Sequence, residues 1–438
     1  MTGREQRIAD LRRGPGELSF EARIGDDATR VEMRADGDFE PNAEAALAAC
    51  LMPAMRFGGT LEMPEAVSPR VLRNQREFQA VQRAWSLEWP FGDPQLEEVE
   101  VRAPTRVPPP GRKGRVAAFF SGGVDSWSTV LDHPELTDLI FIRGFDLRDD
   151  WEHQAGLVDE VEARLRQAAA ELDMPLHVVS TNLRELSDPL ARWETYFGCA
   201  TVAVAHFMAP LFERVLIAGD SDHEVQVPVG ASRLVSGLWS SEAVEIVEDG
   251  GRFSRIERLR RIASHPLVHR TLRVCWRNLD GAYNCGRCRK CMLTMVPLEA
   301  IGALDRVSTF SAALDVDRLV DEEIDQPVSL TLWEDVLDCV REARRDDLEP
   351  AVEEFVERGK RRLGLPPSYR RRRSPGPPPL RPEAKRRHRE ALAAAEGQRD
   401  AAAELATVLG SRSWRLTSPL RGVGLVARRL RRRRDGTR

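Results

Sequence analysis

An anion-binding turn is predicted by six consecutive residues: Ser121, Gly122, Gly123, Val124, Asp125 and Ser126. An apolar stretch precedes them and a stretch with helical spacing follows, so backbone N–H groups and the start of a helix are expected to meet at one point. The two glycines permit positive φ and close backbone approach, and the two serines supply hydroxyls, with Ser126 also suited to cap the helix. The pattern therefore predicts a phosphate-binding loop, and a simple tight turn is the alternative.

Asp125 is the unusual member of this loop, because a carboxylate beside a bound phosphate is unfavourable unless a cation compensates it. We expect Asp125 either to hold Mg²⁺ or to orient the loop. The loop differs from GxxxxGK[ST], since it lacks the lysine and has another spacing.

Four cysteines further along the chain have the spacing of a metal site. They form a C-x9-C-x2-C-x2-C pattern of Cys275, Cys285, Cys288 and Cys291. Gly286 permits the tight turn within it, and four thiolates complete a Zn²⁺ shell that leaves no position for water. The pattern predicts a zinc ion that stabilises the fold, with an iron–sulfur cluster or metal-free reduced cysteines as alternatives. The other cysteines, Cys50, Cys199 and Cys339, lie in apolar helical stretches and are predicted core residues.

Alternating strands and helices are predicted to position both motifs. Short apolar stretches typical of buried strands lie at 115–120, 136–145, 176–181 and 214–219. The segments between them, 126–133, 151–172 and 193–212, have the length and spacing of helices. This alternation predicts an α/β fold with a doubly wound parallel sheet, in which ligands bind at the carboxyl ends of the strands.

The rest of the chain divides by composition. Residues 1–113 predict an α+β domain that ends at a Pro- and Gly-rich connector. Residues 114–304 form the predicted α/β domain and 305–365 a helical region. A Pro- and Arg-rich linker is predicted at 366–382, followed by an exposed helix and a basic tail at 383–438.

Charge is distributed unevenly along the 438 residues. The formal net charge is −4, but Pro366 to the end holds 20 Lys and Arg against 6 Asp and Glu, which leaves −18 on the rest. No signal peptide and no run of 18 apolar residues occurs, so we expect a cytoplasmic protein. We expect the basic tail to dock on an anionic membrane surface or an envelope-biosynthesis partner, and nucleic acid is the less favoured ligand.

The loop and the cysteines together resemble a known family. SGG-x-DS after the first strand of an α/β domain is similar to the PP-loop of the N-type ATP pyrophosphatases. With the cysteine pattern, residues 115–304 resemble 7-cyano-7-deazaguanine synthase. The resemblance implies an enzyme that uses ATP, Mg²⁺ and Zn²⁺, transfers AMP to a carboxylate or carbonyl oxygen of a small molecule, and lets a nitrogen nucleophile displace AMP. It implies ATP binding by residues 121–126 and a catalytic role for Asp125 and Ser126.

The chain also departs from that family, since about 110 residues precede the loop and nearly 150 follow Cys291, the last cysteine of the cluster. A closer resemblance is to a subgroup with an LWSSE segment and a DG-x4-R-x2-[KR] segment. Here these segments are residues 238–242 and Asp249-Gly250 with Arg255 and Arg258. The resemblance therefore leaves the acceptor substrate open.

Two other functions fit the same residues. Thiolation of tRNA would need a reactive cysteine, for which Cys199 is the candidate, and a non-catalytic ATP-binding scaffold in envelope polysaccharide biosynthesis would use the tail. Candidates for binding substrate or Mg²⁺ are Asp146, Asp220, Ser221, Asp222 and His223. Candidates for holding a phosphate or carboxylate are Arg255, Arg258, Arg260 and Arg261. A solvated polar surface is the alternative for each.

Overall fold

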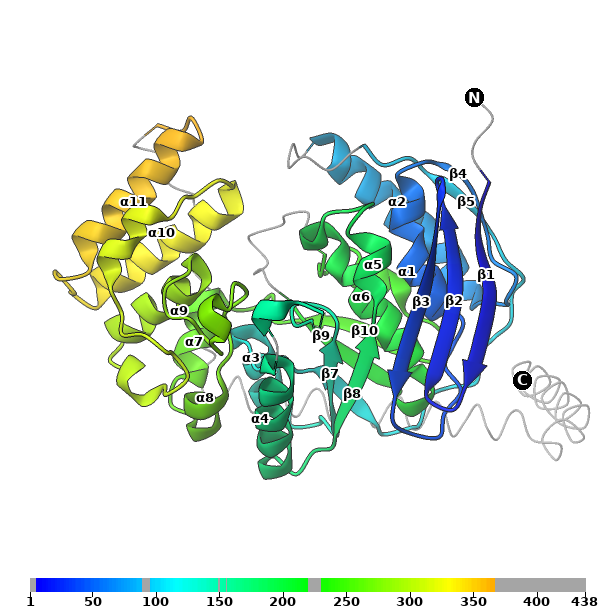
Figure 1. The fold of residues 1–438 in the computed structure, drawn as a ribbon, viewed down its shortest axis with the longest axis horizontal. Helices are drawn as coiled ribbons and strands as arrows, with labels where there is room; N and C mark the ends of the chain where they lie inside the picture. Colours follow the sequence, from blue (N-terminus) through cyan, green and yellow to red (C-terminus); the bar gives the residue numbers. More distant parts are fainter. Residues whose placement is uncertain (1–4, 89–94, 149, 155, 220–229, 367–438) are drawn as a thin grey trace, which may run out of the picture. The chain divides into compact units, whose positions relative to one another are not determined.

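One ten-stranded sheet runs through the part of the chain that the computed structural model describes, residues 5–88, 95–148, 150–154, 156–219 and 230–366. Its strands are β1 (Glu5–Gly14), β2 (Glu17–Ile24), β3 (Asp27–Ala35), β4 (Gly59–Glu62), β5 (Val99–Arg102), β6 (Val116–Phe119), β7 (Asp138–Arg143), β8 (Leu176–Thr181), β9 (Arg214–Ala218) and β10 (Glu245–Asp249). They lie in the order β10-β9-β6-β7-β8-β3-β2-β1-β4-β5 (Figure 1). Neighbouring strands are parallel, except that β2 is antiparallel to β1 and β3, and β3 is antiparallel to β8.

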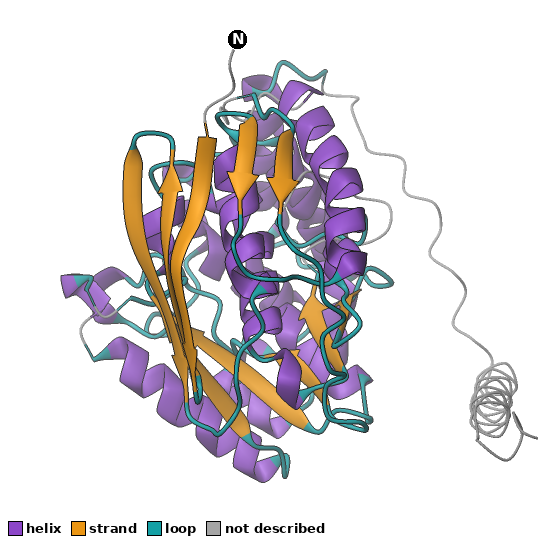
Figure 2. Ribbon diagram, turned by 90° about the vertical axis from the view of Figure 1, so that its right-hand side faces the viewer, coloured by secondary structure: helices purple, strands orange, loops and turns teal. Residues whose placement is uncertain are grey.

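Helices flank this sheet, as Figure 2 shows. They are α1 (Glu44–Met55), α2 (Pro69–Glu88), α3 (Val124–Asp132), α4 (Leu157–Glu171), α5 (Leu183–Ser187), α6 (Trp193–Phe207), α7 (Arg255–Ile262), α8 (Pro266–Thr271), α9 (Arg289–Ala300), α10 (Pro327–Glu342) and α11 (Glu349–Arg362). Successive residues of β6 face opposite sides: Ala117 packs in one core with α1 and α6, whereas Ala118 packs in another with α3 and α4. The predicted α/β fold with helices on a mainly parallel sheet is confirmed.

The parallel half of the sheet has a strand order compatible with a doubly wound fold. Read across the sheet, β8-β7-β6-β9-β10 is the order 3-2-1-4-5 along the chain. The winding direction reverses between β6 and β9, which lie next to each other. In open α/β sheets, a crevice forms outside the carboxyl ends of the strands at such a reversal, and ligands bind there.

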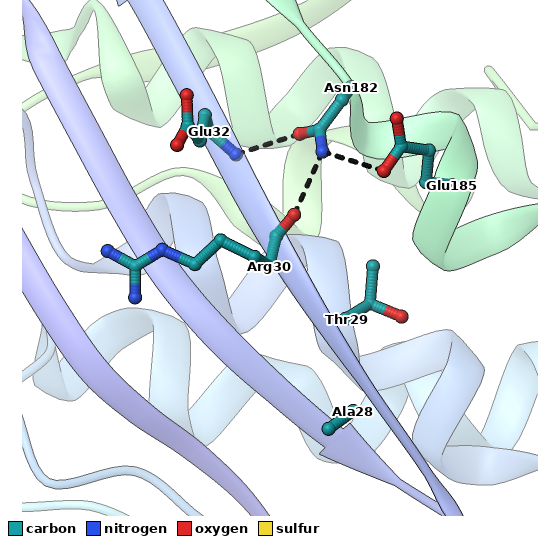
Figure 3. Close-up of a pocket in the computed structure, with 6 residues that line it drawn as sticks. All are labelled: Ala28, Thr29, Arg30, Glu32, Asn182 and Glu185. Atoms are coloured by element: carbon teal, nitrogen blue, oxygen red, sulfur yellow. Dashed lines mark hydrogen bonds between the residues drawn. The ribbon is translucent and has the colours of Figure 1, made fainter.

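The N-terminal strands extend this sheet across the predicted boundary at residue 113. Strand β3 pairs with β8 from Met33 opposite Thr181 to Ala35 opposite Val179. Asn182 reinforces the junction, because its Oδ1 accepts a hydrogen bond from the N–H of Glu32 (2.8 Å) and its Nδ2 donates to the carbonyl of Arg30 (2.8 Å) (Figure 3). A polar recess of about 510 Å³ lies beside this junction. The pairing covers two strand edges that would otherwise be open to association with other chains.

The C-terminal described part is helical, as predicted for 305–365. Helices α10 and α11 form a third core in which Trp333 packs edge-on against Phe355, with ring centroids 4.8 Å apart. Met292 of α9 belongs to the same core and joins these helices to the cysteine region. Figure 1 shows α10 and α11 at the end of the described fold opposite β1–β3. The predicted exposed helix and basic tail at 383–438 lie outside the described residues, as does nearly all of the linker.

Candidate anion site and four-cysteine cluster

The loop at 121–126 lies at the carboxyl end of β6, beside the reversal point of the sheet. Strand β6 ends at Phe119, and α3 begins at Val124 with Gly123 as its N-cap. Gly122 has φ +75°, and a Cβ at this position would lie 3.0 Å from the carbonyl oxygen of Thr271. The positive φ therefore favours glycine at position 122, and the close approach of Thr271 leaves little room for a Cβ. Gly123 has φ −74°, so its backbone does not need glycine.

The first turn of α3 follows directly from the glycine-rich loop. No side chain caps this helix, and its first-turn N–H groups lack intrahelical partners. The prediction that Ser126 caps the helix is wrong, because α3 begins two residues earlier than Ser126. Instead, the Ser126 hydroxyl donates to the carbonyl of Gly123 over 3.1 Å and stabilises the first turn.

Asp125 is held by two arginines from α7. Its Oδ1 accepts a hydrogen bond from Arg258 Nη1 (2.6 Å) and its Oδ2 accepts one from Arg255 Nη1 (3.1 Å). Burial opposes the ionised form of Asp125, but Arg255 and Arg258 outweigh it and lower the pKa of this carboxyl below its ordinary value, with help from Lys290. Both oxygens of Asp125 therefore have partners within the protein.

Arg258 also ties together the ends of two neighbouring strands. Its side chain is 1% exposed and donates to the carbonyls of Gly219, which follows β9, and Gly250, which follows β10. A capping box of Ser254 and Glu257 fixes the start of its helix. The sequence predicted Arg255 and Arg258 as candidates but not Asp125 as their partner. Arg260 and Arg261 are more exposed and pair with Glu342 and Asp132.

A segment from Thr271 to Cys275, called the strap below, runs between the loop and the first cysteine. The N–H of Arg273 donates to the carbonyl of Gly122 over 2.9 Å. Arg273 is 7% exposed, and its Nε and Nη2 have no hydrogen-bond partner among the described residues. Sequence analysis missed Arg273, since nothing in the pattern separates it from neighbouring arginines that face solvent.

The four cysteines are brought together as predicted. Their sulfurs all lie within 4.8 Å of one another, and all four residues are buried. Cys275 Sγ lies 3.5 Å from Cys285 Sγ and 3.8 Å from Cys288 Sγ, and Cys285 Sγ lies 3.9 Å from Cys291 Sγ. A tetrahedral zinc ion with Zn–S bonds of about 2.3 Å places its sulfurs roughly 3.8 Å apart. The cluster can therefore hold a metal ion such as zinc.

Side chains of the cysteine knuckle hold the strap in place. Asn284 Oδ1 accepts hydrogen bonds from the N–H groups of Val274 (2.8 Å) and Cys275 (3.0 Å), and its Nδ2 donates to the carbonyl of Leu272 (2.8 Å). The Tyr283 hydroxyl donates to the carbonyl of Thr271 over 2.8 Å. Since the strap contacts Gly122, the cysteine cluster and the loop are mechanically connected.

Two acidic residues lie at the carboxyl end of β10. Glu248 is 7% exposed, and burial raises its pKa to about 7, against the opposing effect of Arg233. Asp249 accepts hydrogen bonds from His133 Nε2 (3.0 Å) and Thr129 Oγ1 (2.8 Å). The hydrogen bond to Asp249 raises the pKa of His133 to about 9. This edge of the sheet therefore carries the ion pair of Asp249 with His133 and the buried carboxyl of Glu248, which lies 3.5 Å from Arg233 Nε.

The other predicted residues have different outcomes. Asp146 accepts a hydrogen bond from Trp193 Nε1 over 3.1 Å. Asp220, Ser221, Asp222 and His223 lie outside the described residues. Cys50, Cys199 and Cys339 are buried as predicted, and burial raises the pKa of Cys199 to about 12. A buried thiol with a raised pKa is a poor nucleophile, which disfavours Cys199 as a sulfur carrier.

Comparisons of the chain with protein-family models, with curated proteins and with solved structures find no match. Among the described residues, no helix is both long and apolar enough to cross a membrane. Function is therefore inferred from the geometry of the loop, its basic surroundings and the cysteine cluster.

Proposed function

We propose that this protein is an ATP-dependent enzyme of the PP-loop type. It transfers AMP to a carboxylate or carbonyl oxygen of a small molecule and releases pyrophosphate, and a nitrogen nucleophile then displaces AMP. The reaction would resemble that of 7-cyano-7-deazaguanine synthase, and the resemblance leaves the acceptor open.

The position of the loop carries this proposal. A glycine-rich turn with an uncapped helix start directly follows β6, which lies next to β9 where the winding of the sheet reverses. Backbone N–H groups at such a position bind phosphate oxygens. Gly122 supports the same function, since its positive φ lets the turn bring backbone N–H groups together, and a Cβ here would meet the carbonyl of Thr271 and the side chain of Leu165.

Basic side chains around the loop favour an anionic ligand. Arg255, Arg258 and Lys290 act on Asp125, so three positive charges surround one negative charge there. The buried guanidinium of Arg273 lies on the strap side, where Asp146 and the cysteine cluster also act on it. The surplus therefore comes from Arg255, Arg258 and Lys290. A triphosphate with bound Mg²⁺ carries a net negative charge and would be attracted to this surplus.

We propose that Mg²⁺ binds together with ATP. Both oxygens of Asp125 accept from arginines, so the donor set here does not offer Mg²⁺ a free carboxylate. The cysteine cluster fits zinc, which would stabilise the strap and take no part in the reaction. The chain's own contribution would be to hold the pyrophosphate end of ATP and to orient the α-phosphate toward the acceptor, which is positional and electrostatic catalysis.

Product analysis tests the proposal. Zinc-loaded protein would be incubated with MgATP, ammonia and a panel of small carboxylates that includes 7-carboxy-7-deazaguanine, and the nucleotides would be separated by chromatography. We expect AMP and pyrophosphate in the presence of one acceptor class. Formation of ADP and phosphate instead would contradict cleavage between the α and β phosphates.

A further inference from the structure

We propose that Arg273 is a phosphate-binding residue that completes the loop site from the strap side. Nothing in the family resemblance points to this position. The inference rests on the proposed nucleotide site and adds to it a side chain that contacts the ligand.

Burial without partners is the first observation. Arg273 is 7% exposed, and two of its nitrogens, Nε and Nη2, are buried without a hydrogen-bond partner among the described residues. Burial lowers the pKa of Arg273 against the opposing charge of Asp146, but arginine stays ionised in proteins, and a buried charge whose N–H groups lack hydrogen bonds is strongly unfavourable. Such a group is expected to have a partner in the working state of the protein, and that partner must be an anion or an acceptor.

Position beside the loop is the second observation. The backbone N–H of Arg273 donates to the carbonyl of Gly122, and Arg273 Cβ lies 3.7 Å from the point that a Cβ on Gly122 would occupy. The carbonyl of Arg273 lies 3.6 Å from the corresponding point on Gly123. Arg273 therefore lies directly beside both glycines of the loop, whose N–H groups would bind the same phosphate.

The chemistry of guanidinium fits this position. Nε and Nη2 form one edge of the guanidinium fork, which can donate two parallel hydrogen bonds to two oxygens of one phosphate group. Arg258, by contrast, already donates to Asp125 and to backbone carbonyls. Of these two buried arginines, Arg273 is the one whose free edge can be given to a ligand.

The test compares Arg273→Met with Arg270→Met. Arg270 is an exposed arginine of α8 that pairs with Glu171. Binding of inorganic pyrophosphate, MgATP and adenosine would be measured by calorimetry, together with the zinc content and the Tm of the ligand-free protein. We expect Arg273→Met to weaken the binding of pyrophosphate and of MgATP at least about tenfold and to leave the affinity for adenosine unchanged. Its ligand-free Tm should not fall, since neither Nε nor Nη2 has a described partner to lose. Arg270→Met should behave as the wild type in every assay.

Three results would overturn the inference. One is unchanged pyrophosphate affinity in Arg273→Met. Another is a loss of zinc from Arg273→Met with unchanged affinity for pyrophosphate, which would mean that the guanidinium balances the charge of the thiolates. The third is a wild-type protein that binds no pyrophosphate. If pyrophosphate binds through Arg273 but ATP is never cleaved to AMP, the proposed function fails and the phosphate site stands.

Discussion

At the scale of residues, the contact between Asp125 and α7 decides how the loop is held. A carboxylate in a phosphate-binding loop opposes its ligand unless its charge is compensated. Here Arg255 and Arg258 provide that compensation from within the protein, and the two arginines leave the surroundings of the loop positive. Of the two roles predicted for Asp125, orienting the loop is the one that these contacts support.

Arg258→Met tests this contact. The substitution leaves Asp125 without its shorter ion pair and removes hydrogen bonds to Gly250 and Phe253, so we expect it to lower the free energy of unfolding by about 3–5 kcal/mol. Arg261→Met is the matched control on the same helix. Its side chain is 45% exposed and pairs with Asp132, so the expected loss is below about 1 kcal/mol. Urea unfolding measures both, and equal losses would show that Arg258 has no special structural role.

Glu248→Gln tests the buried carboxyl of β10. Burial raises the pKa of Glu248 to about 7, Asp249 adds to this effect, and Arg233 and Arg258 oppose it. A folded-state pKa above the unfolded one stabilises the protein below the unfolded pKa, and this contribution is lost as the pH rises through about 7. Glu248→Gln should therefore be more stable than the wild type at pH 8 and similar at pH 4.5.

The control for this experiment is Glu245→Gln, at the exposed start of the same strand. Urea unfolding of both variants at the two pH values gives the comparison. A Glu248→Gln variant that is less stable than the wild type at pH 8 would show that the ion pair with Arg233 outweighs burial.

At the scale of elements, the turn between β6 and α3 depends on Gly122. Alanine at positive φ costs about 1–2 kcal/mol in any turn, and here its Cβ would also press against Thr271 of the strap. Gly114 has a similar φ of +77° with no atom within 4 Å of a Cβ, so Gly114→Ala isolates the backbone cost. We expect Gly122→Ala to lower the Tm more than Gly114→Ala does. Equal losses of Tm would indicate that the strap shifts without cost to accept the added Cβ.

The strap predicts a link between the metal and the loop. Tyr283 and Asn284 of the cysteine knuckle hold residues 271–275, which in turn contact Gly122. Removal of zinc with a chelator should therefore lower the Tm and weaken the binding of MgATP together, and added zinc should restore both. Full MgATP affinity in metal-free, folded protein would show that the loop binds its ligand independently of the cysteine cluster.

At the scale of the whole molecule, periodicity predicted the parallel half of the sheet because its strands are continuous apolar runs. The stretches predicted at 115–120, 136–145, 176–181 and 214–219 all contain observed strands. Strands β1, β4, β5 and β10 were not predicted, since each mixes charged or polar residues with apolar ones and lacks a continuous apolar run. The joining of the N-terminal strands through β3 and β8 could not be predicted, because long-range pairing leaves no local pattern.

The candidate site was predictable to a similar extent. The loop and the cysteines have fixed local spacing, so their residues could be named from the sequence. Asp125 meets Arg258 across 133 positions, and Arg273 is distinguished only by its burial and its missing partners. Such contacts arise from tertiary packing, and neither the residue types nor their spacing reveals them.

The binding of MgATP by the loop is the most direct test of this account, since it needs no knowledge of the acceptor. Calorimetric titration of zinc-loaded wild type, Gly122→Ala and Gly114→Ala at equal concentration gives the comparison. The account predicts saturable binding in the roughly micromolar to millimolar range for the wild type and Gly114→Ala, and at least about tenfold weaker binding for Gly122→Ala. No binding by the wild type, or equal binding by all three proteins, would contradict it.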